Sequence, residues 1–240
     1  MRDEIILQLR RLNQEFYQTF ASSFAETRAR LQPGVTRILD RVTTSDSILD
    51  LGCGNGGVAR HLAQHGHLGE YYGLDSSPAL IEIARENYPH PLAQFFVADL
   101  AERDWSQLVP ESFNQIFAFA VMHHIPGEAL RIQLLNQIHE LLANGGSFIL
   151  SNWNFPESER LQNRVLPWST IEFEETDVEP GDALLDWRRD GYGLRYVHHF
   201  NEDELARLAQ ATGFRIADTF YSDGEGGRLG LYQIWEKRSI

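Results

Sequence analysis

The stretch "ILDLGCGNGG", from Ile48 to Gly57, decides the fold of this chain. Its apolar first half predicts a short buried strand, and its glycines predict a tight turn into a helix. Such a turn lets a ligand approach the backbone, and the helix N-terminus that follows favours negative groups. Read through Gly52, Gly54 and Gly57, the turn matches the G-x-G-x-x-G pattern of dinucleotide sites. However, Asp50 would repel a pyrophosphate there and would favour a ligand that carries an amino or sulfonium group.

Strands and helices are predicted to alternate at short spacing up to residue 155, which indicates a parallel sheet covered on both faces. The expected strands are residues 47–51, 70–75, 93–100, 113–122 and 147–155. The expected helices are residues 3–24, 33–41, 58–66, 77–88 and 127–146. Ser77 is the expected N-cap of the fourth of these helices, with Pro78 in its first turn.

The pattern changes after residue 155. Residues 156–200 show no clear period and are interpreted as a partly irregular insertion or lid over the site. A capped helix follows, with Asn201 as N-cap and Glu204 at the capping-box position, and then an antiparallel strand pair around "GEGG". We therefore expect one domain: residues 1–45 a helical cap, 46–155 a cofactor-binding core, 156–200 the lid or substrate insertion, and 201–240 the final helix and strand pair.

Composition limits the function classes. The 240-residue chain has a formal net charge of −13 and one lysine, Lys237, which disfavours broad binding to a phosphate backbone. The single cysteine, Cys53, excludes an internal disulfide framework. No apolar run is long enough to span a bilayer. A soluble protein of the reducing cytoplasm is the expectation, with no membrane partner.

Three aspartates, Asp50, Asp75 and Asp99, end three successive predicted strands, so they are expected at one edge of the sheet, where such folds bind ligands. An acid at the position of Asp75 typically accepts hydrogen bonds from ribose hydroxyls. Asp99 can accept from an adenine amino group, and the amide of Leu100 can reach a ring nitrogen. S-adenosylmethionine fits this set, because it has a ribose, an adenine, an amino group and a sulfonium but no phosphate.

The chain resembles the class I S-adenosylmethionine-dependent methyltransferases in "ILDLGCGNG", "YYGLDSSPALIEIA", "FFVADL", "FNQIFAFAVMHHI" and "LLANGGSFILSNW", over about two-thirds of its length. The resemblance implies an α/β, Rossmann-like doubly wound fold, whose mostly parallel seven-stranded sheet has an antiparallel last strand. It also implies that the cofactor is S-adenosyl-L-methionine. The implied cofactor-binding residues of the core are Asp50, Gly52, Gly54, Asp75, Ser76, Asp99, Leu100, Phe119 and Ala120.

A narrower resemblance links "FYQTFASSFAETRARLQPGV", "VLPW", "LRYVHHFNEDELARLAQATGF" and "FYSDGEGGRLGLYQIWEK" to the tRNA methyltransferases that esterify carboxymethyluridine at the wobble position. It implies that Tyr17 and Arg28 hold the cofactor carboxylate, for which an arginine fork is suited. It also implies acceptor-side roles for Trp168, Arg195, Tyr196, His198, Tyr221 and Asp223. An enzyme of that type with this acidic balance would rely on an activating partner protein to bind RNA.

Methyl transfer from a sulfonium is an in-line displacement that needs position and dryness more than an enzyme nucleophile. A carboxylate acceptor is already ionised and needs an anchor, for which Arg195 is our candidate, whereas a phenol or amine needs a base. The candidate bases are His123, His124 and His198, and Trp153 is a candidate substrate contact. The paired histidines do not have metal-ligand spacing, so no metal is expected.

Four functions stay open at this point. The leading one is methyl transfer to the carboxylate of a modified wobble uridine in tRNA, or to a related carboxylate. The second is an O- or N-methyltransferase of small molecules. The third is a non-catalytic cofactor-binding subunit of a methyltransferase complex, which the intact aspartates speak against. A dehydrogenase is a distant fourth.

Overall fold

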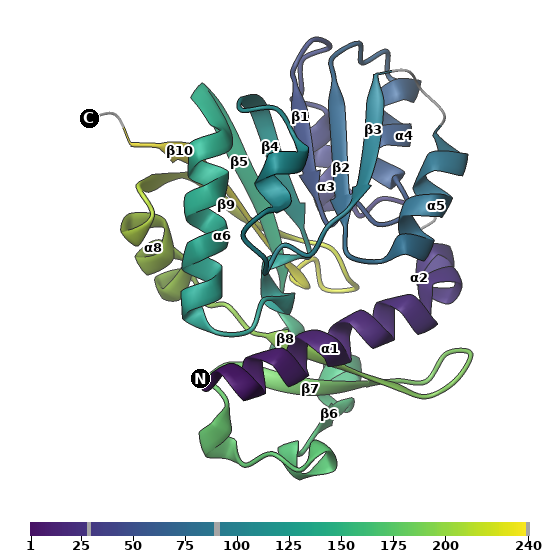
Figure 1. The fold of residues 1–240 in the computed structure, drawn as a ribbon, viewed down its shortest axis with the longest axis vertical. Helices are drawn as coiled ribbons and strands as arrows, with labels where there is room; N and C mark the ends of the chain where they lie inside the picture. Colours follow the sequence, from purple (N-terminus) through teal and green to yellow (C-terminus); the bar gives the residue numbers. More distant parts are fainter. Residues whose placement is uncertain (28–29, 89–91, 239–240) are drawn as a thin grey trace.

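The computed structural model describes residues 1–27, 30–88 and 92–238, and its main feature is a seven-stranded sheet of order β3-β2-β1-β4-β5-β10-β9 (Figure 1). Neighbouring strands are parallel from β3 to β5, and β10 is antiparallel to both β5 and β9. The predicted α/β class and the antiparallel last strand are therefore confirmed. The strands are β1 Ile48–Leu51, β2 Tyr71–Asp75, β3 Ala93–Val97, β4 Phe113–Phe119, β5 Leu142–Trp153, β9 Phe214–Ser222 and β10 Gly230–Lys237.

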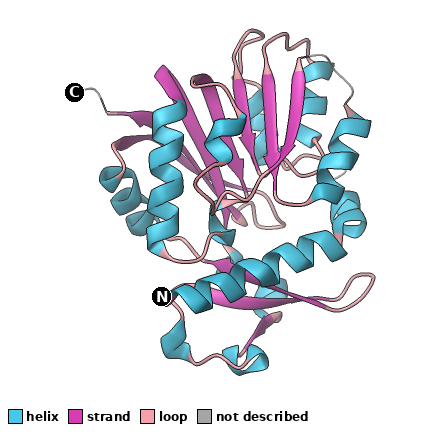
Figure 2. Ribbon diagram, viewed as in Figure 1, coloured by secondary structure: helices cyan, strands magenta, loops and turns pink. Residues whose placement is uncertain are grey.

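Helices cover both faces of this sheet, as the alternation predicts (Figure 2). One apolar cluster packs α6 and α8 against the sheet, and a second packs α3, α4 and α5 against the opposite face. The helices are α1 Asp3–Thr19, α2 Ala21–Thr27, α3 Pro33–Leu39, α4 Gly57–Gln64, α5 Pro78–Asn87, α6 Glu128–Leu141, α7 Glu159–Gln162 and α8 Glu202–Ala211. None of the helices in the described ranges is long and apolar enough to cross a membrane.

Two expected helices have different ends in the structure. The first is interrupted at Phe20, so residues 3–24 form α1 and most of α2. The other, expected to run to residue 146, ends at Leu141, because Leu142 takes an extended conformation and pairs with Phe113 of β4. Strand pairing overrides the helical period there, and β5 begins five residues earlier than expected.

Both expected N-caps are present. The Ser77 hydroxyl accepts from the amide of Leu80 at 3.4 Å, and the Asn201 side chain accepts from the amide of Glu204 at 2.8 Å. Glu204 does not complete the capping box, because its carboxylate binds His198 instead. That contact joins α8 to the segment that precedes it.

Residues 156–200 are more regular than expected. They form a second, antiparallel sheet of order β6-β7-β8, made of Val165–Leu166, Asp182–Trp187 and Gly193–His198. The expectation of a partly irregular insertion misses this sheet, since its strands are short and alternate poorly. In Figure 1, α1 lies between the second sheet and the lower end of the main sheet.

The side chain of Asn13 ties α1 to the edge of the second sheet. It donates to the backbone oxygen of Tyr196 at 3.1 Å and accepts from the amide of the same residue at 2.8 Å. A buried side chain thus replaces the strand that β8 lacks on this side. The helix is thereby fixed across the ends of the main strands, where the predicted site lies.

Candidate functional site

A cavity of about 610 Å³ opens where the carboxyl ends of the main strands meet α1 and the second sheet. The turns after β1, β2, β3 and β4, the end of β5 and one side of α1 all contribute to its wall. Parallel sheets with helices on both faces place ligands at this edge. The cavity therefore lies where the strand-end aspartates predict the site.

The glycine turn after β1 forms one wall. Gly52 has φ +68°, and a Cβ at this position would lie 2.4 Å from Cγ2 of Val121, so the turn accepts only glycine without a shift. Gly54 has φ +54°, and a Cβ there would meet nothing within 4 Å. The open space beside Gly54 is the close approach to backbone that the sequence pattern predicts for a ligand.

Asp50 lines the cavity but is only 2% exposed. Burial raises the pKa of its carboxyl group to about 7, although the hydroxyl of Tyr71 donates a hydrogen bond to it and opposes the shift. Burial therefore favours the protonated form of this carboxyl group when no cationic ligand is bound. A positive charge in the cavity would stabilise its ionised form.

Asp75 and Ser76 lie at the end of β2 and line the cavity. The Asp75 carboxylate accepts from the amide of Gly54 at 3.0 Å and from the amide of Ser77 at 2.9 Å. Burial raises the pKa of Asp75, while these amides work against the shift. The carboxylate joins the first two turns and keeps lone pairs for ligand hydroxyls.

Asp99 and Leu100 follow β3 and also line the cavity. The Asp99 carboxylate accepts from the amide of Ala101 at 2.9 Å and from Nη2 of Arg10 at 2.9 Å. Arg10 comes from α1 and also contacts Glu102. The N-terminal helix thus reaches the position expected to receive the adenine.

The turn after β4 forms the last part of the wall where the cofactor is expected. Phe119 and Ala120 line the cavity, and Ala120 has φ +58°, which is unusual for a residue with a Cβ. The amide of Ala120 donates to the backbone oxygen and the hydroxyl of Ser151. These bonds fix β4 to β5 at the point where both strands reach the cavity.

Four of the expected residues, Tyr17, His124, Trp153 and Arg195, meet at the other end of the cavity. Nδ1 of His124 lies 3.1 Å from the backbone oxygen of Tyr196, which can only accept, so Nδ1 carries the proton of a neutral ring. Nε2 then accepts from the hydroxyl of Tyr17 at 2.7 Å. This fixes the tautomer of His124 and leaves Nε2 engaged.

Arg195, on β8, is 3% exposed and lies among aromatic rings. Its guanidinium carbon is 4.5 Å from the ring centre of Trp153, 5.3 Å from that of Phe16 and 5.6 Å from that of Trp187. A positive charge in such a low-dielectric wall attracts anions strongly.

Other expected acceptor-side residues are not among the cavity-lining residues of the described chain. Trp168 is buried beside Phe173, and the hydroxyl of Tyr196 donates to Asp182. His198 is 1% exposed, and Tyr221 donates to Glu202 on the surface. His123 is fully buried and packs against the ring of Trp153. For these five the structure offers packing and hydrogen-bonding roles in place of the expected contact with the acceptor.

His198 has well-defined partners of this kind. Its Nδ1 lies 2.7 Å from Asp182 and its Nε2 lies 3.0 Å from Glu204. Burial lowers the pKa of His198, but the two carboxylates outweigh burial and raise it. The guanidinium of Arg131, whose side chain is 1% exposed, also contacts both carboxylates. The histidine therefore belongs to an ionic network that joins α6, α8 and the second sheet.

Two further expectations have separate outcomes. Asp223 does line the cavity, but its carboxylate accepts from the amide of Gly34 at 2.9 Å and from the hydroxyl of Tyr232 at 2.5 Å, so it also links α3 to β10. Arg28, expected to hold the cofactor carboxylate, lies outside the described residues. In the described ranges, no group of three or more histidine, cysteine or carboxylate side chains is arranged to hold a metal ion.

Several residues that line the cavity are not predicted by the sequence pattern. Arg10 has no signal in the strand-end pattern because it comes from α1, 89 residues before Asp99. Asn152 lines the cavity, is 1% exposed, and neither its Oδ1 nor its Nδ2 has a hydrogen-bond partner among the described residues. Besides Arg195, four arginines of residues 156–200 line the cavity. A charge count could not have pointed to them, because that segment has ten acidic residues and five arginines.

The fold and the cavity are suited to a nucleoside cofactor at the ends of the parallel strands. A family model described as a methyltransferase domain matches residues 23–219, and the chain belongs to that family. It is an S-adenosylmethionine-dependent methyltransferase, as the sequence pattern predicts.

The similar proteins differ in what their names say they act on. Trans-aconitate 2-methyltransferase of Azoarcus sp. (strain BH72) is 30% identical, over 86% of this chain and 91% of its own. The tRNA (carboxymethyluridine(34)-5-O)-methyltransferase of Macaca fascicularis is also 30% identical, over 60% of this chain but only 20% of that protein.

Solved structures share the fold. A SAM-dependent methyltransferase of Methanosarcina mazei has a TM-score of 0.66 at 23% identity, over 88% of this chain and 99% of its own. A Haloferax volcanii chain, from a complex between the Trm112 methyltransferase activator and a methyltransferase, has the same TM-score at 16% identity, over 97% of this chain and 98% of its own.

Proposed function

We propose that this methyltransferase esterifies a carboxylate, transferring the methyl group of S-adenosylmethionine to a carboxylate oxygen. The observation that carries the proposal is Arg195, a residue that is 3% exposed and lies in the wall of the cavity. An arginine fork binds a carboxylate through two parallel hydrogen bonds, which fixes the position of its oxygens.

The cofactor end of the cavity fits the cofactor by its donor set. The open space at Gly54 admits the methionine part, Asp75 offers oxygens to ribose hydroxyls, and Asp99 with Leu100 faces the adenine. When bound, the cofactor supplies an electrophilic methyl group on a sulfonium. Asp50 supplies a carboxyl group whose ionised form a cation stabilises.

The other residues of the acceptor end position the acceptor and exclude water. A carboxylate is ionised at neutral pH, so no side chain has to remove a proton from it. This agrees with His124, whose Nε2 already accepts from Tyr17. The rings of Trp153, Phe16 and Trp187 surround Arg195 and limit the hydration of an anion bound there.

Two of the similar proteins are named for acceptors that carry carboxylates, namely trans-aconitate and carboxymethyluridine. Both names support ester formation, and they divide on whether the acceptor is a small acid or a tRNA. A small-molecule acceptor agrees with the net charge of −13 and the single lysine. The wobble uridine of tRNA stays the alternative, and with it an activating partner of the kind that the Haloferax volcanii complex contains.

The test is transfer of a labelled methyl group into carboxylic acids and into tRNA, followed by mild alkali. A methyl ester releases its label as volatile methanol, whereas a methylated amine or phenol keeps it. Alkali-stable label contradicts the proposal and favours small-molecule N- or O-methylation. No transfer to any acceptor, with normal cofactor binding, favours the non-catalytic subunit.

Arg195 is tested by Arg195→Met, which keeps the apolar stem. Hydrogen bonds to charged groups contribute about 1.5–3 kcal/mol, so kcat/KM should fall about 10- to 150-fold. Arg195→Lys keeps the positive charge but not the fork of the guanidinium. Its kcat/KM should therefore lie between those of the wild type and of Arg195→Met. Arg103→Gln removes an exposed arginine that lies outside the cavity and is the matched control.

A further inference from the structure

The mouth of the cavity is rich in arginine although the chain is strongly acidic. Over the whole sequence 34 acidic residues face 21 basic ones, whereas the described cavity wall contains seven arginines and five aspartates. Three of the aspartates belong to the cofactor end. We define the outer arginine group as the four that come from residues 156–200, besides Arg195: Arg160, Arg164, Arg188 and Arg189.

A buried aspartate organises two members of this group. Asp186 of β7 is 1% exposed, with Oδ1 at 3.4 Å from Nη1 of Arg164 and Oδ2 at 2.6 Å from Nε of Arg188. Two guanidiniums held by one carboxylate carry a net charge of +1. Each contact uses one of the five N–H donors of an arginine, so most donors are left for a ligand.

The other two members, Arg160 and Arg189, also line the cavity and differ in their ion pairing. Arg160 is exposed and has no ion-pair partner within the part of the chain that the structure describes. It precedes Arg164 by four residues. Arg189 contacts Glu26 at 2.8 Å and Asp190 at 3.6 Å, and each of these ion pairs is exposed on both sides and therefore weak.

Exposure separates this group from Arg195. The side chains of Arg164, Arg189 and Arg188 are 29%, 50% and 63% exposed, against 3% for Arg195 as a residue. The two sets contribute to one cavity wall, with Asp186 and Arg195 on opposite faces of the second sheet, since Leu185, the neighbour of Asp186, pairs with Arg195. The cavity therefore has an enclosed positive site and a second positive site toward solvent.

We infer that the acceptor is a small polycarboxylate: one carboxylate reacts at Arg195, and a second is bound by the outer arginine group. The inference rests on the proposed esterification and adds the substrate class. A monocarboxylate would leave the net positive charge around Asp186 without a counter-ion. A molecule with two or more carboxylates satisfies both sites at once.

The charges favour a small acid over RNA. Binding a nucleic-acid backbone needs basic side chains spread over several phosphates. Here Arg164 and Arg188 converge on one buried carboxylate, so they define one anion position. The net charge of −13 would also repel a long polyanion, whereas a small acid has only to enter the mouth.

The experiment compares two acids with the whole chain and labelled S-adenosylmethionine. Trans-aconitate has three carboxylates, and crotonate offers a similar unsaturated skeleton with one. We expect kcat/KM for trans-aconitate to exceed that for crotonate at least tenfold. Arg188→Gln and Arg160→Gln should each lower the value for trans-aconitate at least fivefold more than the value for crotonate.

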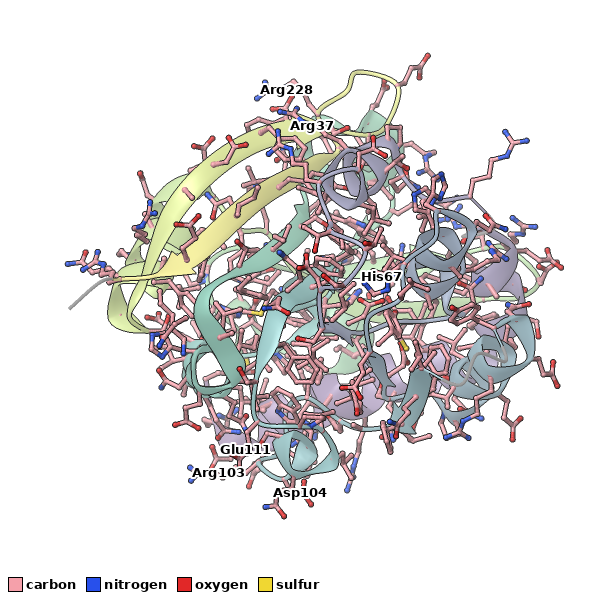
Figure 3. All side chains as sticks on the ribbon, turned by 90° about the horizontal axis from the view of Figure 1, so that it is seen from above. Arg37, His67, Arg103, Asp104, Glu111 and Arg228 are labelled. Atoms are coloured by element: carbon pink, nitrogen blue, oxygen red, sulfur yellow. The ribbon has the colours of Figure 1, made fainter. Side chains whose placement is uncertain are left out.

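The two variants control for folding. Loss of Arg188 weakens the ion pairing of buried Asp186, but Arg160 has no such partner, so Arg160→Gln tests the subsite without that risk. Arg103→Gln, an exposed arginine that Figure 3 shows beside Asp104 and away from the labelled Arg228 and Arg37, should change neither acid more than twofold.

The other outcomes separate the two proposals. Equal esterification of both acids overturns the polycarboxylate inference and leaves the proposed esterification intact. The same holds if neither Arg188→Gln nor Arg160→Gln lowers kcat/KM for trans-aconitate more than for crotonate. Ester formation only in an anticodon stem-loop RNA that carries carboxymethyluridine also overturns the inference alone. Alkali-stable label, or no label in any acceptor, overturns both.

Discussion

Asp50→Asn should make the ligand-free protein more stable at neutral pH. Burial raises the pKa of the Asp50 carboxyl group from 3.8 to about 7, against the opposing hydrogen bond from Tyr71. Between these two values the unfolded chain has lost the proton and the folded chain keeps it, so the stability that this group contributes falls as pH rises. Three pKa units correspond to about 4 kcal/mol. Asparagine cannot ionise, and it keeps an oxygen that Tyr71 can donate to.

The assay is urea unfolding of the wild type and Asp50→Asn at intervals from pH 4 to pH 8, without cofactor. Other groups titrate in both proteins, so the difference between them isolates Asp50. From pH 4 to pH 8, the difference in free energy of unfolding between the two proteins should shift in favour of Asp50→Asn by about 4 kcal/mol. For a protein of this length, that corresponds to roughly 8–16 °C in Tm. Asp104→Asn, an exposed aspartate (Figure 3), should shift it by less than about 0.5 kcal/mol. A difference that stays constant with pH would refute the buried-carboxyl reasoning.

The same substitution should weaken cofactor binding. A cation in the cavity lowers the pKa of Asp50, so binding releases a proton and the affinity of the wild type should rise from pH 6 to pH 8. Asp50→Asn should lose this rise in calorimetry with S-adenosylmethionine. The residue would then cost stability in the free protein and contribute affinity in the complex.

Three further substitutions test other features of the site. Gly52→Ala places a Cβ 2.4 Å from Cγ2 of Val121 at φ +68°, so urea unfolding should show a loss of about 1–3 kcal/mol, and an unchanged midpoint would contradict the tight turn. Asn152→Leu removes a buried amide without partners in the described chain and should raise stability by about 1–3 kcal/mol; a loss would show that the amide is satisfied. Burial lowers the pKa of His198, but hydrogen bonds to the carboxylates of Asp182 and Glu204 raise it overall. The stability that the charged ring contributes is therefore complete below pH 6.5. It is lost as the pH rises through the pKa of His198 in the folded protein. His198→Gln should therefore cost more stability at pH 6 than at pH 9, and an equal cost at both would refute the charged-histidine network.

That the expected cofactor residues of the core meet in one cavity was predictable, because they are local in sequence. Asp50, Gly52 and Gly54 sit in one strand-turn unit, and Asp75 and Asp99 repeat the same position after the next two strands. Hydrophobic periodicity and strand order are enough to predict that such residues lie at one edge of the sheet, and no knowledge of packing is needed. The structure places all five in the cavity wall.

Which of the expected acceptor-side residues line the cavity was only partly predictable, because this depends on contacts between distant segments. Arg195 and His198 both lie on β8, and nothing in the sequence says that one lines the cavity while the other is held by Asp182 and Glu204. The register of β8 decides this, and it is set by β7 and by Asn13 of α1.

Helix α1 connects the two ends of the site and explains why they form one cavity. Arg10 binds Asp99 at the cofactor end, and Tyr17, two turns further along the helix, binds His124 at the acceptor end. Between them, Asn13 fixes the same helix to β8, the strand that holds Arg195. A ligand that displaces Arg10 from Asp99 therefore acts on the element that also positions the acceptor wall. Arg195 and the outer arginine group come from residues 156–200, apart from the aspartates of the strand ends, so a chain with net charge −13 can still present a local positive field to the anionic acceptor that we propose.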